Sequence, residues 1–147
     1  MTSSDPVQDT SANTAPFQIL SFDGGGLKGL FPAAVLAAIE DDLGCTIADH
    51  FDLIAGTSTG GLIALGLGAG LRPAEIVDFY TSKGPTIFGA GRRVGRLWRS
   101  KHGPDRLRAA LSEVFGDRLL GSSTKRLVLP SYSLDSNDVY VFKTPHH

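Results

Sequence analysis

The sequence contains few of the residues that form covalent or metal cross-links. Cys45 is the single cysteine, which excludes an internal disulfide and a zinc site built on several thiolates. The formal net charge is −1, so no overall charge favours nucleic acid, and no nucleic-acid partner is predicted. No apolar run reaches the roughly 20 residues that a membrane-spanning helix needs. We predict neither a metal nor another cofactor.

The N-terminal residues 1–16 lack the basic segment and the apolar core of a secretory signal and are rich in Ser, Thr and Asp. This composition predicts a disordered polar tail and residence in the cytoplasm. The whole chain has 147 residues, of which 41% are hydrophobic and 20% charged. That suits one globular domain, predicted over 17–147, and is too short for two of ordinary size.

Apolar segments predict strands and helices that alternate in the first half of the chain, which favours an α/β fold with a parallel sheet and right-handed crossovers. The second half ends in two apolar segments joined by a Ser-Asn-Asp turn, a candidate hairpin. Because residues 33–39 are almost wholly apolar, their helix is expected to be buried on most sides. The expected strands are 17–22, 51–56, 126–134 and 138–143, and the expected helices are 30–44, 62–68, 74–82 and 104–115.

The segment 51–61 has the pattern of a buried strand, a very tight turn and a helix. It contains Gly56-x-Ser58-x-Gly60, with Ser58 at the apex of the turn. A nucleophile on such a turn leaves no room for side chains two residues before and after it, which explains both glycines. The helix would also direct unpaired N–H groups at the serine. A plain Ser-Gly turn is the alternative, in a chain with 18 glycines.

A second glycine-rich segment, 23–29, has the sequence Asp-Gly-Gly-Gly-Leu-Lys-Gly and follows the first predicted strand. Gly24-x-Gly26-x-x-Gly29 fits the dinucleotide-binding fingerprint, so a nucleotide-binding module is one alternative. That fingerprint requires an acidic residue at the far end of the second strand, where residues 55–58 contain none. A P-loop is excluded because no Gly-Lys-Ser/Thr closes the segment.

The other alternative joins the two glycine motifs in one site. Consecutive glycines at a helix N-terminus present N–H groups that no side chain obstructs, which suits an anion. Neighbouring parallel strands end at one edge of a sheet, so the glycine segment and Ser58 should meet there. The segment then forms an oxyanion hole for the serine, with Gly25 and Gly26 as the best candidate donors.

Together, the motifs at 23–29 and 56–61 resemble those of the patatin-like phospholipase family, and the likeness extends from about residue 17 to residue 143, nearly all of the chain after the predicted tail. It implies an α/β three-layer sandwich with a mostly parallel central sheet, here incomplete at the C-terminus. It also implies a lipid acyl hydrolase, phospholipase A-like or lysophospholipase-like, that cleaves phospholipids or other acyl lipids through a Ser-Asp dyad. Ser58 would be the nucleophile, and Gly25 and Gly26 would supply the oxyanion N–H groups.

The sequence departs from this family at two places. Lys28 stands where the family often has arginine, which keeps the charge but loses a planar fork of donors. The dyad aspartate lies in a later Asp-Gly-Gly or Asp-Gly-Ala motif, and none follows Ser58, so we expect a truncated domain without its dyad aspartate. A serine without a base is a poor nucleophile, so the chain alone should hydrolyse esters weakly or not at all. Later aspartates without a following glycine include Asp105, Asp117, Asp135 and Asp138.

A histidine could replace the missing base only in a Ser, acid, His order. His102, His146 and His147 follow Ser58, but none comes after a strand with a partner acid in register, so a triad is not favoured.

The segment 83–101 is basic, contains aromatic residues and has no acidic residue. Peripheral contact with anionic lipid headgroups is one interpretation, which fits a phospholipid substrate. A solvated loop whose arginines pair with surface acids is the other.

Overall fold

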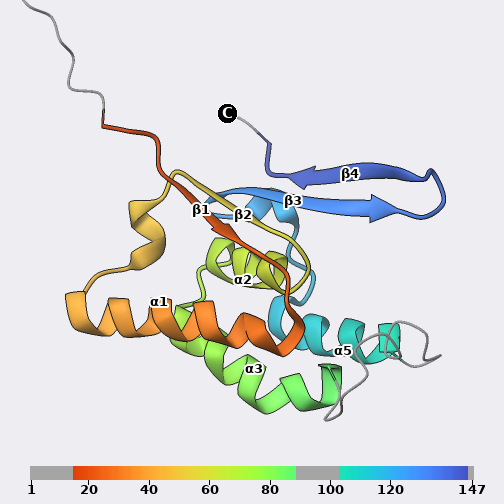
Figure 1. The fold of residues 1–147 in the computed structure, drawn as a ribbon, viewed down its shortest axis with the longest axis horizontal. Helices are drawn as coiled ribbons and strands as arrows, with labels where there is room; N and C mark the ends of the chain where they lie inside the picture. Colours follow the sequence, from red (N-terminus) through yellow and green to blue (C-terminus); the bar gives the residue numbers. More distant parts are fainter. Residues whose placement is uncertain (1–14, 89–102, 146–147) are drawn as a thin grey trace, which may run out of the picture.

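The computed structural model describes residues 15–88 and 103–145, which form an α/β structure on one four-stranded sheet (Figure 1). The predicted tail therefore lies almost wholly outside the described residues. The strand order is β1-β2-β3-β4, with β1, β2 and β3 parallel and β4 antiparallel to β3. The predicted α/β class with a mostly parallel sheet is confirmed. The elements are β1 (Ile19–Phe22), η1 (Gly26–Gly29), α1 (Leu30–Leu43), η2 (Ile47–His50), β2 (Leu53–Gly56), α2 (Thr59–Gly68), α3 (Pro73–Phe88), α5 (Gly103–Phe115), η3 (Leu120–Ser122), β3 (Arg126–Ser133) and β4 (Asp138–Lys143), where η marks a 3₁₀ helix.

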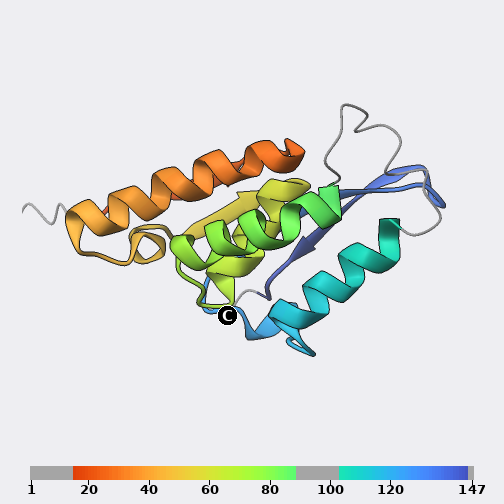
Figure 2. The same ribbon diagram turned by 90° about the horizontal axis from the view of Figure 1, so that it is seen from below.

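The described helices all lie on one face of the sheet (Figures 1 and 2). This follows from the strand order, because two successive right-handed crossovers in the same direction place their helices on the same side. The described residues thus supply the sheet and the helices of one side of the predicted three-layer arrangement. The core lies between them, around the fully buried Ile54, Ile63 and Leu127.

Helix α2 is the element that packs most closely on the sheet, across β1, β2 and β3. Eight of its ten residues are buried, and four of the ten are glycines. Small side chains let the α2 backbone approach the strands, and this close approach fixes the start of the helix relative to the sheet edge. The next layer is formed by α1 and α3, which pack against one another.

Helix α1 differs from its prediction, because it is not buried on most sides. Its buried positions form a single stripe of Ala33, Leu36 and Glu40, while Phe31 is 73% exposed. The apolar sequence could not distinguish a helix covered on every side from one that packs mainly against α3. Helix α3 also extends past the predicted end at residue 82, because packing against α1 and α5 outweighs the low helix propensity of Gly84 and Pro85.

The predicted hairpin of β3 and β4 is confirmed, with Val128 opposite Lys143 and Ser133 opposite Asp138. All six residues of β4 are exposed. None of the described helices is long and apolar enough to cross a membrane.

The face of the sheet away from the helices carries many apolar side chains. Alternation along β1 and β2 places Ile19, Leu53 and Ala55 on this face, since Leu20 and Ile54 contact the core. The face continues into the hairpin, where the paired residues Pro130 and Val141, and Tyr132 and Val139, are all exposed. We call the set Ile19, Leu53, Ala55, Val128, Pro130, Tyr132, Val139 and Val141 the open face.

A buried carboxylate joins α1 to the start of η2 and to the residue directly before α3. Glu40 is 3% exposed and accepts hydrogen bonds from the Ile47 N–H (2.9 Å) and from Arg72 Nε (3.0 Å). Nearby, Lys125 Nζ donates to Asp49 Oδ1 at 2.7 Å, and this hydrogen bond and the ammonium charge lower the pKa of the Asp49 carboxyl. These contacts hold η2 against α3 and β3.

Candidate active site

The two glycine motifs leave neighbouring parallel strands at the same edge of the sheet. Phe22, the last residue of β1, is in register with Gly56, the last residue of β2. The Thr57 N–H donates to the Phe22 carbonyl at 3.2 Å just beyond both strands. The predicted juxtaposition is therefore present: the segment after β1 and the turn after β2 lie side by side.

Ser58 stands at the bend between β2 and α2 and is exposed to solvent. Its backbone has φ 53° and ψ −121°, a region that a residue with a side chain rarely occupies. The turn is closed by hydrogen bonds from Gly60 N–H to Thr57 O (2.9 Å) and from Leu62 N–H to Ser58 O (3.2 Å). A strained, exposed serine between a strand and a helix is the geometry expected of a nucleophile elbow.

The glycines on either side of Ser58 are required by close backbone contacts. A Cβ on Gly56 would collide with the carbonyl of Gly60, and a Cβ on Gly60 would collide with the carbonyl of Phe22. The spacing of Gly56 and Gly60 is therefore a consequence of how the elbow packs on β1.

The glycines of the first motif pack against the elbow as well. A Cβ on Gly24 would come within 2.9 Å of Ser58 Cβ, and a Cβ on Gly29 within 3.1 Å of Thr59 Cβ. These contacts explain why positions 24 and 29 are glycines without a bound nucleotide. They favour the joined site over the dinucleotide alternative, which assigns the same glycines to a pyrophosphate.

The N–H groups of the two predicted oxyanion donors differ in whether a side chain already accepts a hydrogen bond from them. The Gly25 N–H donates to the side-chain oxygen of Thr59, Oγ1, at 2.9 Å. Gly26 has φ +59° and begins η1, and within the described residues its N–H makes no such bond to a side chain. The loop is closed by the Lys28 N–H, which donates to the Gly25 carbonyl at 3.1 Å.

Two residues of this site were missed by the sequence analysis. Thr59 is 1% exposed, and its carbonyl accepts a hydrogen bond of 3.0 Å from the hydroxyl of Tyr80 on α3. Tyr80 is itself 1% exposed, and burial raises the pKa of its phenol, so the hydroxyl stays protonated. A polar Thr59 inside an apolar, glycine-rich helix was a usable signal, but Tyr80 looked like any residue of an apolar helix face.

No candidate base contacts the serine within residues 15–88 and 103–145: neither a carboxylate nor an imidazole is hydrogen-bonded to Ser58 Oγ. Asp52 lies at the start of β2, where it accepts a hydrogen bond of 2.7 Å from the Gln18 N–H. It is thus at the opposite end of the strand from Ser58 and from any nucleotide on the glycine segment. His102, His146 and His147 lie outside the described residues.

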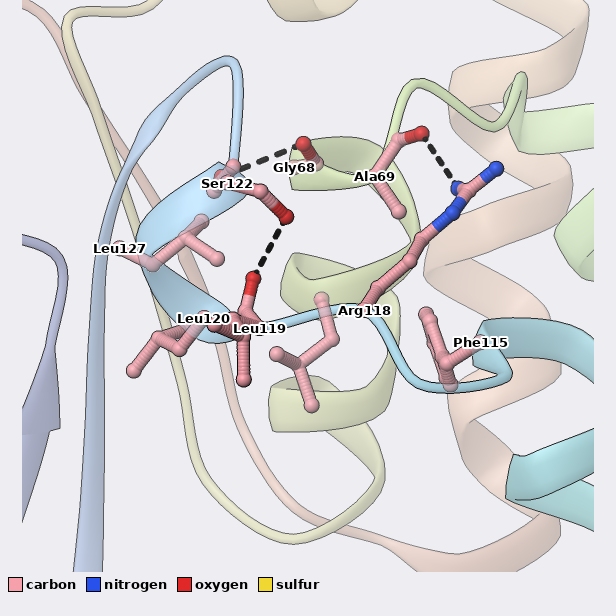
Figure 3. A pocket seen from close by; sticks show the side chains of 10 residues that line it. Gly68, Ala69, Phe115, Arg118, Leu119, Leu120, Ser122 and Leu127 are labelled. Carbon is pink, nitrogen blue, oxygen red and sulfur yellow. Dashed lines mark hydrogen bonds between the residues drawn. The ribbon is translucent and has the colours of Figure 1, made fainter.

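A cavity of about 390 Å³ lies at the other end of α2 from Ser58 (Figure 3). Four of its ten lining residues are leucines, and Arg118, which also lines it, donates a hydrogen bond of 3.0 Å to the Ala69 carbonyl. Because a whole helix separates this cavity from Ser58, it is not part of the candidate active site.

No three His, Cys, Asp or Glu side chains gather as a metal site requires in the part of the chain that the structure describes. The basic segment 83–101 lies largely outside that part. Its first residue, Lys83, pairs with Glu113 on α5 at 2.8 Å.

Comparison with known proteins adds an independent finding. The family model for the patatin-like phospholipases matches residues 20–146. The chain is 39% identical over 135 residues to a cGAMP-activated phospholipase of Pseudomonas aeruginosa, and the match covers 89% of this chain and 40% of that protein. A cGAMP-activated phospholipase of Escherichia coli is 32% identical over 154 residues (96% and 43%), and patatin-like protein 4 of Arabidopsis thaliana is 33% identical over 147 residues (87% and 37%). The chain spans about two fifths of the length of these relatives.

Proposed function

The chain belongs to the patatin-like phospholipase family, and on that premise we propose that it carries the nucleophile part of a serine lipid acyl hydrolase. Ser58 is the nucleophile. The observation that carries the proposal is the placement of Ser58, strained and exposed, directly against the glycine segment at the shared edge of β1 and β2. Carboxyl ends of parallel strands are where α/β enzymes place their sites.

In the proposed reaction, Ser58 Oγ forms a bond to the carbonyl carbon of an acyl ester while its proton passes to an aspartate. The carbonyl oxygen becomes an oxyanion, which N–H groups of the glycine segment stabilise. The C–O bond to the alcohol then breaks, and the aspartate returns the proton to the leaving alcohol. Water hydrolyses the acyl-enzyme, which releases the fatty acid and regenerates the serine.

The proposed oxyanion donors are Gly25 and Gly26, and the hydrogen bonds favour Gly26 as the primary one. The Gly25 N–H already donates to Thr59 Oγ1 at 2.9 Å, so it would have to leave or share that bond to reach a substrate. Gly24 and Gly29 let the segment pack on the elbow, as Gly56 and Gly60 do for the turn itself.

The dyad aspartate is proposed to lie in a part of the family domain that the match to the relatives does not cover, because none of the described carboxylates is hydrogen-bonded to Ser58. The substrate is proposed to be a phospholipid or another acyl lipid, in line with the family. Peripheral contact with membranes through 83–101 remains a proposal.

A chimera tests the function. The chain, joined after residue 145 to the part of the Pseudomonas relative that follows its matched segment, is expected to release fatty acid from phosphatidylcholine vesicles. The 147-residue chain alone should release little, because it lacks the base. Replacement of the nucleophile in the chimera, Ser58→Ala, should lower kcat by about a thousandfold or more.

The control is Ser122→Ala, an exposed serine of η3 at the other end of α2 from Ser58, which should leave the rate unchanged. A folded chimera that hydrolyses lipid equally well with Ser58→Ala would contradict the proposal. Robust Ser58-dependent turnover by the 147-residue chain would contradict the placement of the base outside it. Thermal stabilisation by a dinucleotide, without hydrolysis, would support the nucleotide-binding alternative.

A further inference from the structure

The structure contains a hydrogen-bonded connection from α3 through the elbow to the glycine segment. Tyr80 donates to the carbonyl of Thr59, and Thr59 Oγ1 accepts from the Gly25 N–H. We propose that Thr59 and Tyr80 are positioning residues, which set the glycine segment at the distance from Ser58 that the oxyanion requires. This inference rests on the proposed roles of Ser58 and the glycine segment.

Thr59 is suited to this role because its hydroxyl oxygen and its carbonyl oxygen each accept a hydrogen bond and its side chain is buried. Its hydroxyl oxygen receives the Gly25 N–H at 2.9 Å, although the two residues are 34 positions apart in sequence. A Cβ added to Gly29 would lie 3.1 Å from the Cβ of Thr59, so Thr59 also packs against the far end of the glycine segment. Thr59 therefore touches the segment at both ends of η1.

Tyr80 fixes Thr59 from the side of α3. Its hydroxyl is 3.0 Å from the Thr59 carbonyl, and it would lie 3.4 Å from a side chain on Gly29. Edge-to-face packing with Phe79, at 5.9 Å between ring centroids, holds the ring. Because burial raises the pKa of the Tyr80 phenol, it remains a donor throughout the neutral and mildly alkaline range.

The glycine segment needs such a support because three successive glycines have wide backbone freedom. Donors aimed at a developing charge are effective only when their position is set before the reaction. The Thr59 hydroxyl restricts the segment at Gly25, the residue directly before the proposed donor Gly26. A strained, exposed nucleophile thus stands beside a loop held by a buried side chain.

The first experiment measures hydrogen exchange of the Gly25 amide by NMR in the 147-residue chain. Thr59→Val removes the acceptor at nearly constant volume and should accelerate Gly25 exchange about tenfold. Thr59→Ser restores the hydroxyl and should return the rate to near that of the unmodified chain. Tyr80→Phe should give a smaller acceleration of about threefold, because it loosens Thr59 and leaves the acceptor in place.

Thr144→Val is the matched control. Thr144 is a buried threonine directly after β4. Its Oγ1 accepts a hydrogen bond of 3.0 Å from the backbone N–H of Leu127 on β3. The same loss of a buried hydroxyl there should leave Gly25 exchange unchanged. If Thr59→Val exchanges at Gly25 as slowly as the unmodified chain, the proposal is overturned; if Thr59→Val does not fold, Thr59→Ser and Tyr80→Phe decide it.

The second experiment measures the rate at which a fluorophosphonate modifies Ser58 in the chimera, where a P–O bond forms, fluoride leaves and the serine proton passes to the dyad aspartate. We expect Thr59→Val to slow it five- to tenfold, and Thr59→Ser and Thr144→Val to leave it within twofold. Equal rates for Thr59→Val and the unmodified chimera, with the Gly25 bond lost, would overturn the positioning role. Absence of labelling in the unmodified chimera counts against the proposed function, and hydrogen exchange in the 147-residue chain still tests the contact.

Discussion

Ser58 occupies a backbone conformation that costs of order 1–3 kcal/mol for a residue with a side chain. It is retained because its neighbours leave no alternative: the Thr57 N–H is bound to the end of β1, and the Leu62 N–H is bound to the Ser58 carbonyl. The strain places the serine oxygen outside the core, which a regular strand-to-helix connection would not do. At the scale of single residues, the site is thus defined by backbone contacts.

Tyr80 gives the fold a pH dependence at alkaline pH. In the unfolded chain a tyrosine ionises near pH 10, whereas burial raises the pKa of Tyr80 in the folded chain. Above about pH 10 the unfolded state therefore loses a proton that the folded state keeps, so stability falls as pH rises, by up to about 1.4 kcal/mol per pH unit. Tyr80→Phe should remove this slope and, at neutral pH, lower stability by about 1 kcal/mol.

Urea unfolding between pH 8 and pH 11 measures the effect. Tyr140→Phe is the control, because Tyr140 is 58% exposed on β4, and this variant should keep the alkaline slope. An identical slope for Tyr80→Phe and the unmodified chain would show that Tyr80 ionises without unfolding.

At the scale of elements, Glu40 connects α1, on which it lies, to η2 and to the residue directly before α3. It accepts the Ile47 N–H at the start of η2 and pairs with Arg72, which precedes α3, at 2.9 Å. Glu40→Ala would leave the buried Ile47 N–H without an acceptor, and we expect a loss of about 2–3 kcal/mol in the free energy of unfolding.

The matched control is Glu113→Ala, which removes the exposed pair between α5 and Lys83. Exposed ion pairs contribute at most about 1 kcal/mol, so this variant should unfold at nearly the same urea concentration as the unmodified chain. Equal losses for the two variants would mean that Glu40 acts only as a surface charge.

At the scale of the whole molecule, the described helices cover one face of the sheet, and within residues 15–88 and 103–145 nothing covers the open face. Contiguous exposed apolar surface binds hydrophobic dyes, and we expect the folded chain to enhance the fluorescence of anilinonaphthalene sulfonate. The double variant Val139→Thr/Val141→Thr keeps strand propensity and should reduce the fluorescence by about a third or more.

Leu134→Ser is the control, since Leu134 is 87% exposed but lies in the hairpin turn outside the open face. Near-UV circular dichroism distinguishes dye binding by a native surface from binding by a loosely packed state. A folded chain that binds no dye would contradict this view of the open face.

The sequence alone was sufficient for the element order, the parallel pairing and the meeting of the two glycine motifs, because these depend on local patterns and on the handedness of crossovers. It was insufficient for the exposure of α1, since Phe31 has the same apolar character whether or not another layer covers it. The sequence could not predict the hydrogen bond from the Gly25 N–H to Thr59 either. The two residues are 34 positions apart and meet only because β1 and β2 end side by side at one edge of the sheet.

The register between β1 and β2 has a consequence for how this protein tolerates insertions. Phe22 and Gly56 end their strands in step, and this alignment sets the segment beside the serine. One extra residue inside either strand would turn its side chains to the opposite face and carry one motif past the other. An insertion between α1 and η2 avoids this change of register, because that connection lies outside both strands and enters the sheet at the far edge. Engineers who wish to graft new loops onto this scaffold should therefore open the chain between Gly44 and Thr46 and leave both short strands at their present length.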